Sequence, residues 1–445
     1  MTTVISIPVL IAIIASLEIN ESFKAYNKRY SVNEIRIAES NTFKKLNSVS
    51  YPNGDKPTKS EITELEIRTY NNFSNRTYRS LIDTSKQDNM SYSVVGLYST
   101  MNELTKATSN SELNMKFNTL LGLNESKRTS FYKKIMEANS FAREESTIQL
   151  KNAAFFNNEY NFSQDYVNYL TRVYCEAYQI DFKKESDKIV EWASQAVNSN
   201  GYIDKNFLDM DEETQLYLLS TLYFKNAWNE KYLSEDNTRD YFYLSGDNKI
   251  KTTFMKHSYQ MEAYYDYGSY ISFSDSYFNG YASVTYIVPK KVEDNIFELT
   301  KTANIFEEKE ANKVEAEKYD PFIVNLTTPK FTTSSVIDFQ KCLENLGFEK
   351  MFDRKYDSFK NAFEAEGLEF HHAYLQNLKQ KNEVEFNEDG STVKSVTIAP
   401  IGMMGAVHVS QGKTLEIELN QPFIYIIRDY NDIPRFVGHF DNPKA

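Results

Sequence analysis

The sequence contains little cysteine, glycine and proline. Its 445 residues include 2 cysteines, 14 glycines and 10 prolines. So little glycine and proline excludes a fibrous, collagen-like chain. Cys175 and Cys342 lie far apart in segments that look helical, and they match no metal-binding or redox spacing. We therefore expect two free thiols, and disulfide usage does not indicate the cellular compartment.

Positive charge is also in deficit. Lys and Arg total 50 against 62 Asp and Glu, which gives a net charge of -12 at pH 7. The sequence holds no basic run of the kind that a phosphate-binding face requires. We therefore expect no nucleic-acid partner.

The signatures of common enzymes are absent as well. There is no glycine-rich phosphate loop, no H-E-x-x-H zinc motif and no G-x-S-x-G nucleophile motif. Only His371 and His372 are adjacent histidines, and neighbours on a strand point to opposite faces, so this pair is a poor metal chelate. We expect a protein that is not an enzyme and that has no metal site and no cofactor.

What is present is the composition of a globular protein. Hydrophobic residues make up 41%, aromatic residues 14% and charged residues 25% of the chain. The length allows one large domain or two to three of average size. Because no internal repeat or second linker divides the later sequence, we expect one domain over residues 66–445.

The amino terminus is the only membrane-like segment. Residues 4–17 are almost entirely apolar, but this run is shorter than the ~20 residues that a spanning helix needs. We interpret residues 1–17 as a signal peptide, which predicts a secreted protein with no stable membrane span. The alternative is a buried strand or a membrane-associated tail, in a cytoplasmic protein. Residues 18–65 are polar and irregular, and we interpret them as an extension.

Hydrophobic patterning predicts helices early in the domain and strands later. Apolar residues at helical spacing predict helices over residues 92–104 and 188–197. Runs of β-branched and aromatic residues predict strands at 216–224, 282–288, 384–386, 423–427 and 436–440. This order is typical of an α+β domain with large sheets.

The carboxy-terminal strands carry a specific pattern. Residues 417–428 read I-E-L-N-Q-P-F-I-Y-I-I-R, followed by F-V-G-H-F at 436–440 and N-P at 442–443. This segment closely resembles the carboxy-terminal signature of the serpins. Further resemblances are L-Y-F-K-N-A-W at 222–228, T-P-K-F at 328–331, L-E-N-L-G-F-E-K-M-F at 343–352 and N-M-S-Y-S at 89–93. Together they cover roughly residues 68–443.

The resemblance implies the serpin fold, with three β-sheets, about eight to nine helices and an exposed reactive-centre loop. The V-E-F-N-E-D-G segment at 384–390 resembles the family's hinge, which places the loop at about residues 387–413. The implied function is suicide inhibition of serine, or alternatively cysteine, proteases. A protease cleaves the loop, the freed loop inserts into the largest sheet, and the acyl-enzyme is trapped. We expect a monomer whose partner is a target protease.

Side-chain alternation tests whether this loop can insert. A strand that inserts buries every second residue. Small or β-branched residues occupy one set of positions, which is Ser391, Val393, Ser395, Thr397 and Ala399. The other set would face outward, so Lys394 could stay hydrated. Alternation therefore favours insertion and an inhibitor.

Two features of the loop keep an alternative open. Inhibitory members of the family usually carry a run of alanines where this chain has V-K-S-V at 393–396. Pro400 cannot donate a hydrogen bond to a central ladder, a cost of about 1 kcal/mol. The alternative is a non-inhibitory serpin that acts as a carrier, chaperone or storage protein.

The scissile bond is predicted by counting from the hinge. In inhibitory members the residue before this bond lies fourteen positions after the hinge glycine, which here is Gly390 and gives Met404–Gly405. Counting backward from Pro422 gives a site near Gln411 instead. We prefer Met404, because insertion depends on the distance from the hinge. Methionine suits the apolar primary pocket of a chymotrypsin-like, elastase-like or subtilisin-like protease.

Two groups of residues are expected to control insertion. The resemblance assigns the loop hinge to Glu388, Asp389, Gly390, Ser391, Thr392 and Val393. It assigns the region where the sheet opens to Ser93, Gly96, Ser220, Trp228 and Gln380. Several of the latter depart from the family pattern, so their buried hydrogen bonds are satisfied differently or the sheet opens more easily.

Overall fold

The fold is known from a computed structural model of the chain. It describes residues 32–444, apart from residues 33, 86–87, 211–213, 245–247, 293, 365–372 and 394–411. The apolar segment 1–17, the pair His371 and His372, and the predicted bond Met404–Gly405 lie outside the described residues. Within the described part, no helix is long and apolar enough to cross a membrane.

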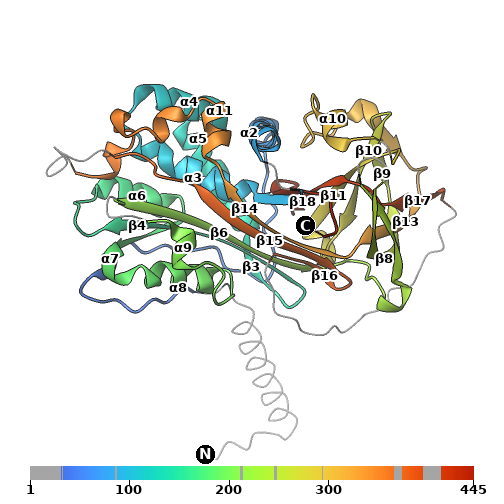
Figure 1. The fold of residues 1–445 in the computed structure, drawn as a ribbon, viewed down its shortest axis with the longest axis horizontal. Helices are drawn as coiled ribbons and strands as arrows, with labels where there is room; N and C mark the ends of the chain where they lie inside the picture. The colour runs from blue at the N-terminus through green and yellow to red at the C-terminus, as the bar shows by residue number, and fades with distance from the viewer. Residues whose placement is uncertain are drawn as a thin grey trace, which may run out of the picture.

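Three β-sheets form the framework (Figure 1). The largest has the strand order β1 (Phe43–Lys45), β5 (Cys175–Ile180), β4 (Ser146–Asn157), β6 (Leu216–Ala227), β16 (Gly390–Val393), β15 (Lys379–Asn387) and β14 (Phe331–Asp338), with β3 (Ser140–Ala142) beside β4. The second runs β12 (Lys313–Glu315), β9 (Ala263–Asp266), β10 (Tyr270–Ser276), β11 (Ala282–Pro289), β18 (Phe423–Asp429), β19 (Pro434–Phe440) and β2 (Met90–Ser93). The third runs β17 (Thr414–Glu418), β13 (Phe322–Pro329), β8 (Lys249–Met261) and β7 (Thr238–Tyr243).

The largest sheet carries helices on both faces, whereas other helices pack elsewhere, α10 (Ile296–Thr300) against β11 of the second sheet. The described α-helices are α2 (Glu64–Thr84), α3 (Val94–Ala107), α4 (Ser111–Leu121), α5 (Glu125–Ala138), α6 (Gln164–Arg172), α7 (Phe182–Glu185), α8 (Asp187–Ala196), α9 (Lys205–Leu208), α10 and α11 (Gln340–Asn345). Both α3 and α8 contact β6, and Figure 1 shows them on opposite sides of it. Successive residues of β4 therefore enter different cores, because Phe155 packs with Trp192 of α8 and Phe156 packs in the larger core.

The predicted helices and strands are confirmed, with two corrections. Cys175 lies in a strand, because β5 is covered on both faces and its sequence therefore lacks the alternation that marks a half-exposed strand. Strands also occur early in the domain, since β4 precedes α6, so the elements are mixed along the chain. Cys342 lies in α11 as expected, and both cysteines are free and buried.

The amino-terminal extension is part of this fold from about residue 34 onward. Phe43 of β1 pairs with Ile180 of β5, is fully buried, and stacks on Tyr178 with ring centroids 5.2 Å apart. The interpretation of residues 18–65 as irregular is therefore wrong for β1. The strand is only three residues long, too short for alternation to show in the sequence.

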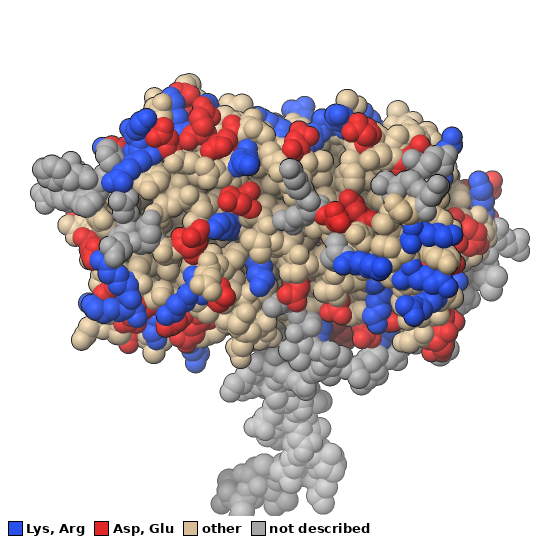
Figure 2. All heavy atoms as spheres, in the orientation of Figure 1, with Lys and Arg blue, Asp and Glu red and all other residues tan. Residues whose placement is uncertain are grey.

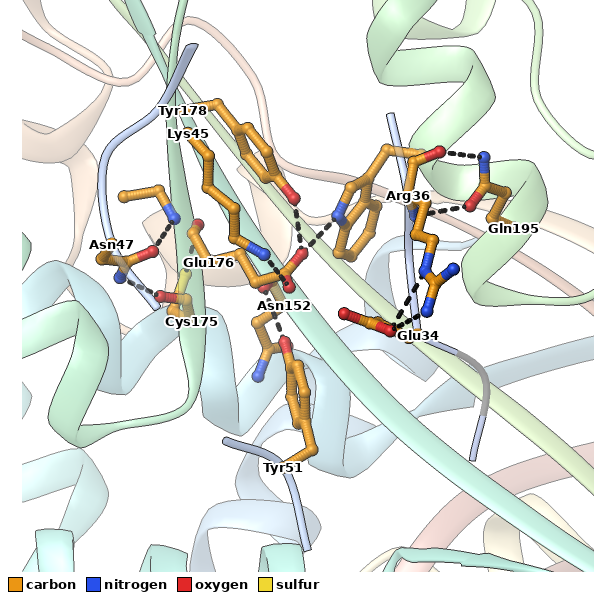
Figure 3. Close-up of polar contacts among 12 residues, drawn as sticks. Glu34, Arg36, Lys45, Asn47, Tyr51, Asn152, Cys175, Glu176, Tyr178 and Gln195 are labelled. Carbon is orange, nitrogen blue, oxygen red and sulfur yellow. Dashed lines mark hydrogen bonds and ion pairs between the residues drawn. The ribbon is translucent and has the colours of Figure 1, made fainter. Parts of the chain in front are cut away.

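Side chains of the extension hold it against the sheet (Figure 3). The buried carboxylate of Glu176 accepts hydrogen bonds from Lys45 Nζ at 2.7 Å and from Trp192 Nε1 at 2.9 Å. Asn47 bonds to the backbone of β5 through both ends of its amide, and the Tyr51 hydroxyl donates to the Asn152 carbonyl at 3.3 Å. The extension therefore acts as an edge strand that is tied to the strands and helix behind it.

Candidate functional site

The predicted hinge already lies within the largest sheet. Strand β16 pairs with β15 on one side and with β6 on the other, and Ser391 lies opposite both Phe386 and Asn226. The expectation that the loop is exposed from about residue 387 is therefore wrong for Gly390–Val393, because these residues form ladder hydrogen bonds at the centre of the sheet. Where the chain enters the sheet it needs glycine, since a Cβ on Gly390 would lie 2.0 Å from the Asn226 carbonyl oxygen.

Ser391 points toward the core, as the alternation predicts. It is 0% exposed, and its Oγ accepts a 2.7 Å hydrogen bond from the Tyr277 hydroxyl. Tyr277 in turn stacks on Trp228 with ring centroids 4.7 Å apart. Thr392 belongs to the set expected to face outward, yet it is 8% exposed, because it lies between β15 and β6.

Trp228 holds the turn that precedes the hinge strand. Its Nε1 donates to the Asn387 carbonyl at 2.8 Å, and its backbone N–H donates to the Asp389 carbonyl at 3.2 Å. The side chain is 1% exposed. Trp228 therefore lies below the point where the chain enters the sheet.

Glu388 anchors the same turn to neighbouring strands. Its carboxylate accepts hydrogen bonds from Asn237 Nδ2 at 2.6 Å and from Lys330 Nζ at 2.8 Å. Burial opposes ionisation of this carboxyl, but the hydrogen bonds from Lys330 and Asn237 outweigh it and hold its pKa below the ordinary value. Glu388 is therefore a carboxylate that fixes the root of the loop.

Beyond β16 the sheet is split between β6 and β15. Among the described strands, neither pairs directly with the other, since β16 alone lies between them. Two cavities of about 60 and 40 Å³ lie along the split, and both are lined by Ser220 of β6 and Gln380 of β15. The slot is therefore bordered by two strands whose facing edges have no ladder partner among the described residues.

The residues assigned to sheet opening fall into two places. Ser93, Gly96, Ser220 and Gln380 come together beside the slot, whereas Trp228 lies at the hinge. Gln380 Oε1 accepts from the Ser93 N–H at 2.6 Å, and its Nε2 donates to the Ser93 carbonyl at 3.2 Å. The buried Ser220 Oγ has no partner among the described residues. A built Cβ on Gly96 would lie 2.9 Å from Gln380 Nε2, which explains the glycine.

Sequence reasoning missed a buried histidine–aspartate contact next to Trp228. His257 Nε2 lies 3.1 Å from Asp275 Oδ2, and both side chains are 3% exposed. Burial raises the pKa of Asp275, and the hydrogen bond to His257 partly offsets this. The signal was a histidine at an inward position of β8, between buried Met255 and Tyr259.

Other chemistry is scarce in the described part of the chain. Its residues include no group of three metal-ligating side chains. Burial raises the pKa of both thiols, that of Cys342 to about 12, so neither cysteine is a ready nucleophile. The described geometry concentrates at the hinge and the slot.

Comparison with known proteins agrees with this geometry. The family model described as Serpin (serine protease inhibitor) matches residues 68–443. Serpin B5 of Homo sapiens is 27% identical over 318 residues, which are 67% of this chain and 78% of that protein. Serpin-Z4 of Hordeum vulgare is 29% identical over 251 residues, which are 53% of this chain and 57% of that protein. Tengpin, a thermophilic serpin solved in its native state, superposes with a TM-score of 0.69 at 19% identity and covers 87% of this chain and 97% of its own.

Proposed function

This chain belongs to the serpin family, and we propose that it inhibits a protease by inserting its cleaved loop into the slot between β6 and β15. Serpins are generally protease inhibitors rather than catalytic enzymes. Inhibition by this chain is the proposal, with a serine protease that accepts methionine as the target.

One observation carries the proposal, namely the hinge strand with the slot beyond it. Strand β16 lies between β6 and β15 from Gly390 to Val393, and no pairing between β6 and β15 occurs in the described part of the chain. A strand that continued in the same register would supply hydrogen bonds to the facing edges of both. Each such bond contributes about 1 kcal/mol net, so a long insertion releases much free energy.

The register indicates how far the loop can travel. Gly390 pairs with Ala227 and Val393 with Phe224, so in the inserted state Thr397 would face Ser220 and Ile401 would face Leu216, the first residue of β6. Residues opposite each other in a ladder share a face, so the Thr397 hydroxyl would lie beside the unpartnered Ser220 Oγ. Insertion would therefore satisfy a polar group that the described residues leave unpaired.

The length of β6 also supports the choice of scissile bond. An inserted strand that ends at Ile401 leaves Met404 three residues beyond the sheet. Cleavage after Gln411 would instead leave a tail of ten residues beyond Ile401. A short tail holds an attached protease against the end of the sheet, so the register favours Met404.

The chemistry of the proposed reaction belongs to the protease. Its serine Oγ attacks the Met404 carbonyl, the bond to Gly405 breaks, and Gly405 leaves with a proton as a new amino terminus. The acyl ester stays on Met404 while residues 394–401 insert. At about 3.3 Å per residue, the ester moves tens of ångströms along the sheet, and the attached protease moves with it.

A denaturing gel tests the proposal. The protein is incubated with chymotrypsin-like, elastase-like and subtilisin-like proteases, and mass spectrometry of the released peptide locates the bond. We expect a protease-sized upward shift and a peptide that begins at Gly405. Clean cleavage without an adduct across the panel, with no gain in thermal stability on cleavage, would favour a carrier, chaperone or storage protein.

A further inference from the structure

A basic patch covers the two strands at one edge of the third sheet. It consists of Arg239 on β7 and Lys249 and Lys251 on β8, all exposed, and the register of the two strands puts all three on one face. Figure 2 shows Lys and Arg side chains gathered over this part of the molecule, at the right of the view. The patch is unexpected on a chain with a net charge of -12.

The charges of this patch are not neutralised locally. In the part of the chain that the structure describes, none of its three cations forms an ion pair, and Asp240, the one acid on β7 and β8, points to the opposite face. Lys249 Nζ and Lys251 Nζ lie 4.2 and 5.2 Å from the ring centroid of Tyr241, which holds both ammonium groups over one face of the hairpin. The cations therefore present a common positive face to solvent.

Acidic groups collect at the opposite edge of the same sheet. Glu416 and Glu418 on β17 are exposed, and β13 separates them from β8. The sheet is therefore positive along β7 and β8 and negative along β17. A partner that covers the sheet contacts positive charge at one edge and negative charge at the other.

The patch lies between the two roots of the loop. Asn237, the residue before β7, bonds to Glu388 at the first root, with 2.6 Å between Nδ2 and Oε1. The second root is β17, where the chain rejoins the third sheet. The N–H of Tyr243, the last residue of β7, donates at 2.7 Å to the carbonyl of Asn420, just after β17. Strand β7 therefore joins the two ends of the loop. A protease that binds the loop would lie next to the surface of β7 and β8.

We propose that the basic patch is a secondary docking surface for an acidic face of the target protease. The inference rests on the proposed function and names a property of the partner, which is negative charge next to its active-site cleft. Exposed charges add little to affinity, but they steer encounter and raise association rates by about 10- to 1,000-fold. Among proteases that accept methionine, the patch therefore favours those with an acidic face, because they associate faster.

Two charge variants of the inhibitor test this inference. The patch variant is R239Q/K249Q/K251Q. A matched control removes three exposed cations from α5 and α6, as K127Q/K133Q/R172Q, with the same change in net charge. The probe is chymotrypsin, either unmodified or succinylated so that its surface lysines become carboxylates. The readout is the second-order rate of reaction at the loop, counting adduct and cleaved protein together.

The expected result is a selective and salt-dependent loss of rate. The patch variant should react with succinylated chymotrypsin at least about 10-fold more slowly than the parent at about 20 mM salt, and the difference should shrink at about 300 mM. The control variant should change the rate by less than about 2-fold. Equal rates for the two variants, or equal slowing by both, would overturn the inference.

Further outcomes separate this inference from the proposed function. If the loop is cleaved without an adduct, the proposed inhibition fails while the rates still report docking. If the protease does not cleave the loop, the affinity of each variant for succinylated chymotrypsin with a blocked serine is measured instead. Equal affinity of the two variants would overturn the inference. If the patch variant loses retention on dextran sulfate but reacts at the parent rate, the surface binds a polyanion and the inference is wrong.

Discussion

The Tyr277 hydroxyl donates a 2.7 Å hydrogen bond to Ser391 Oγ, and both side chains are 0% exposed. This contact fixes the first hinge side chain that enters the largest sheet. It also ties the hinge to Trp228, because the Tyr277 ring stacks on the indole. The position therefore accepts a small neutral side chain and has no room or partner for a charge.

Replacing Ser391 by glutamate should convert the inhibitor into a substrate. A carboxylate buried beside Tyr277 without a cation costs several kcal/mol, so the hinge should leave the sheet and insertion should become slower than hydrolysis of the ester. A gel with chymotrypsin should show cleaved protein in place of the adduct. The control Ser391→Ala, which loses one hydrogen bond worth about 1 kcal/mol, should still form the adduct. Parental adduct yield from the glutamate variant would contradict this account.

Replacing Gln380 by alanine should loosen the slot. The change removes both hydrogen bonds to the backbone of Ser93 and leaves a buried N–H unpaired, a cost of about 1–3 kcal/mol. We expect a lower thermal midpoint and faster spontaneous insertion, measured as the loss of adduct-forming protein during warming. The control Gln376→Ala changes another glutamine, just before β15, whose Oε1 accepts a 2.8 Å hydrogen bond from the Thr214 hydroxyl. An unchanged rate of loss would exclude Gln380 as a restraint on the slot.

Arginine at the predicted bond should redirect the inhibitor to trypsin. Trypsin-like proteases need a basic residue before the scissile bond, and the register favours Met404 at that position. The variant Met404→Arg should form an adduct with trypsin. The matched variant Gln411→Arg should be cleaved without trapping, because its tail beyond the inserted strand is too long. Adduct formation by Gln411→Arg alone would show that the count from the hinge is wrong.

Replacing Phe43 by alanine should destabilise the whole domain. Phe43 is 0% exposed and packs with Phe155 and Trp192, so truncation should cost about 3–5 kcal/mol. The control Lys44→Ala changes the exposed neighbour on the same strand and should cost less than about 0.5 kcal/mol. Urea unfolding followed by fluorescence measures both. Equal midpoints would show that β1 contributes nothing to stability.

A buried carboxyl should make the protein less stable as the pH rises. Glu103 is 1% exposed, and burial raises its pKa well above the ordinary value, partly offset by the nearby Cys175 thiol. The unfolded chain releases this proton near pH 4.3, so stability should fall as the pH rises from there toward the raised native pKa. Glu103→Gln is neutral throughout, so its advantage over the parent should grow with pH.

Urea midpoints at about pH 5, 7 and 9 measure this difference. The control Glu112→Gln alters an exposed carboxyl whose pKa is lowered by hydrogen bonds from Lys350 and Lys116. That group stabilises the fold above its unfolded pKa and loses its effect in acid, which is the opposite sign. A gap between parent and Glu103→Gln that stays constant with pH would contradict a protonated Glu103.

Local sequence was enough to predict several elements of the fold. Strands β18 and β19 and most of the helix predicted over 92–104 are confirmed, although Tyr92 and Ser93 lie in β2. The assignment of the hinge residues stays a prediction. Phe43 was missed because three residues carry no period, and Cys175 because a strand covered on both faces shows no alternation. The first failure comes from the length of the strand and the second from its cover on both faces.

The state of the hinge was beyond sequence reasoning for a different reason. Alternation shows that Ser391 can enter the sheet, but whether it does so before cleavage depends on contacts with Tyr277 and Asn226, which lie far away in the chain. The pair His257 and Asp275 is of the same kind, since β8 and β10 bring it together. Secretion, the monomeric state and the scissile bond stay predictions.

The strand β1 has a consequence for encounters between copies of this protein. A sheet that accepts a strand at its centre can also pair with strands of other molecules. Without β1, strand β5 would be an unpaired edge strand and a second site for such pairing. Because β1 is joined to the domain through residues 46–63, its effective concentration at that edge is on the order of millimolar. A strand from another molecule at micromolar concentration would not displace β1 from β5. Covalent attachment of β1 therefore blocks one route by which such proteins polymerise through their sheets.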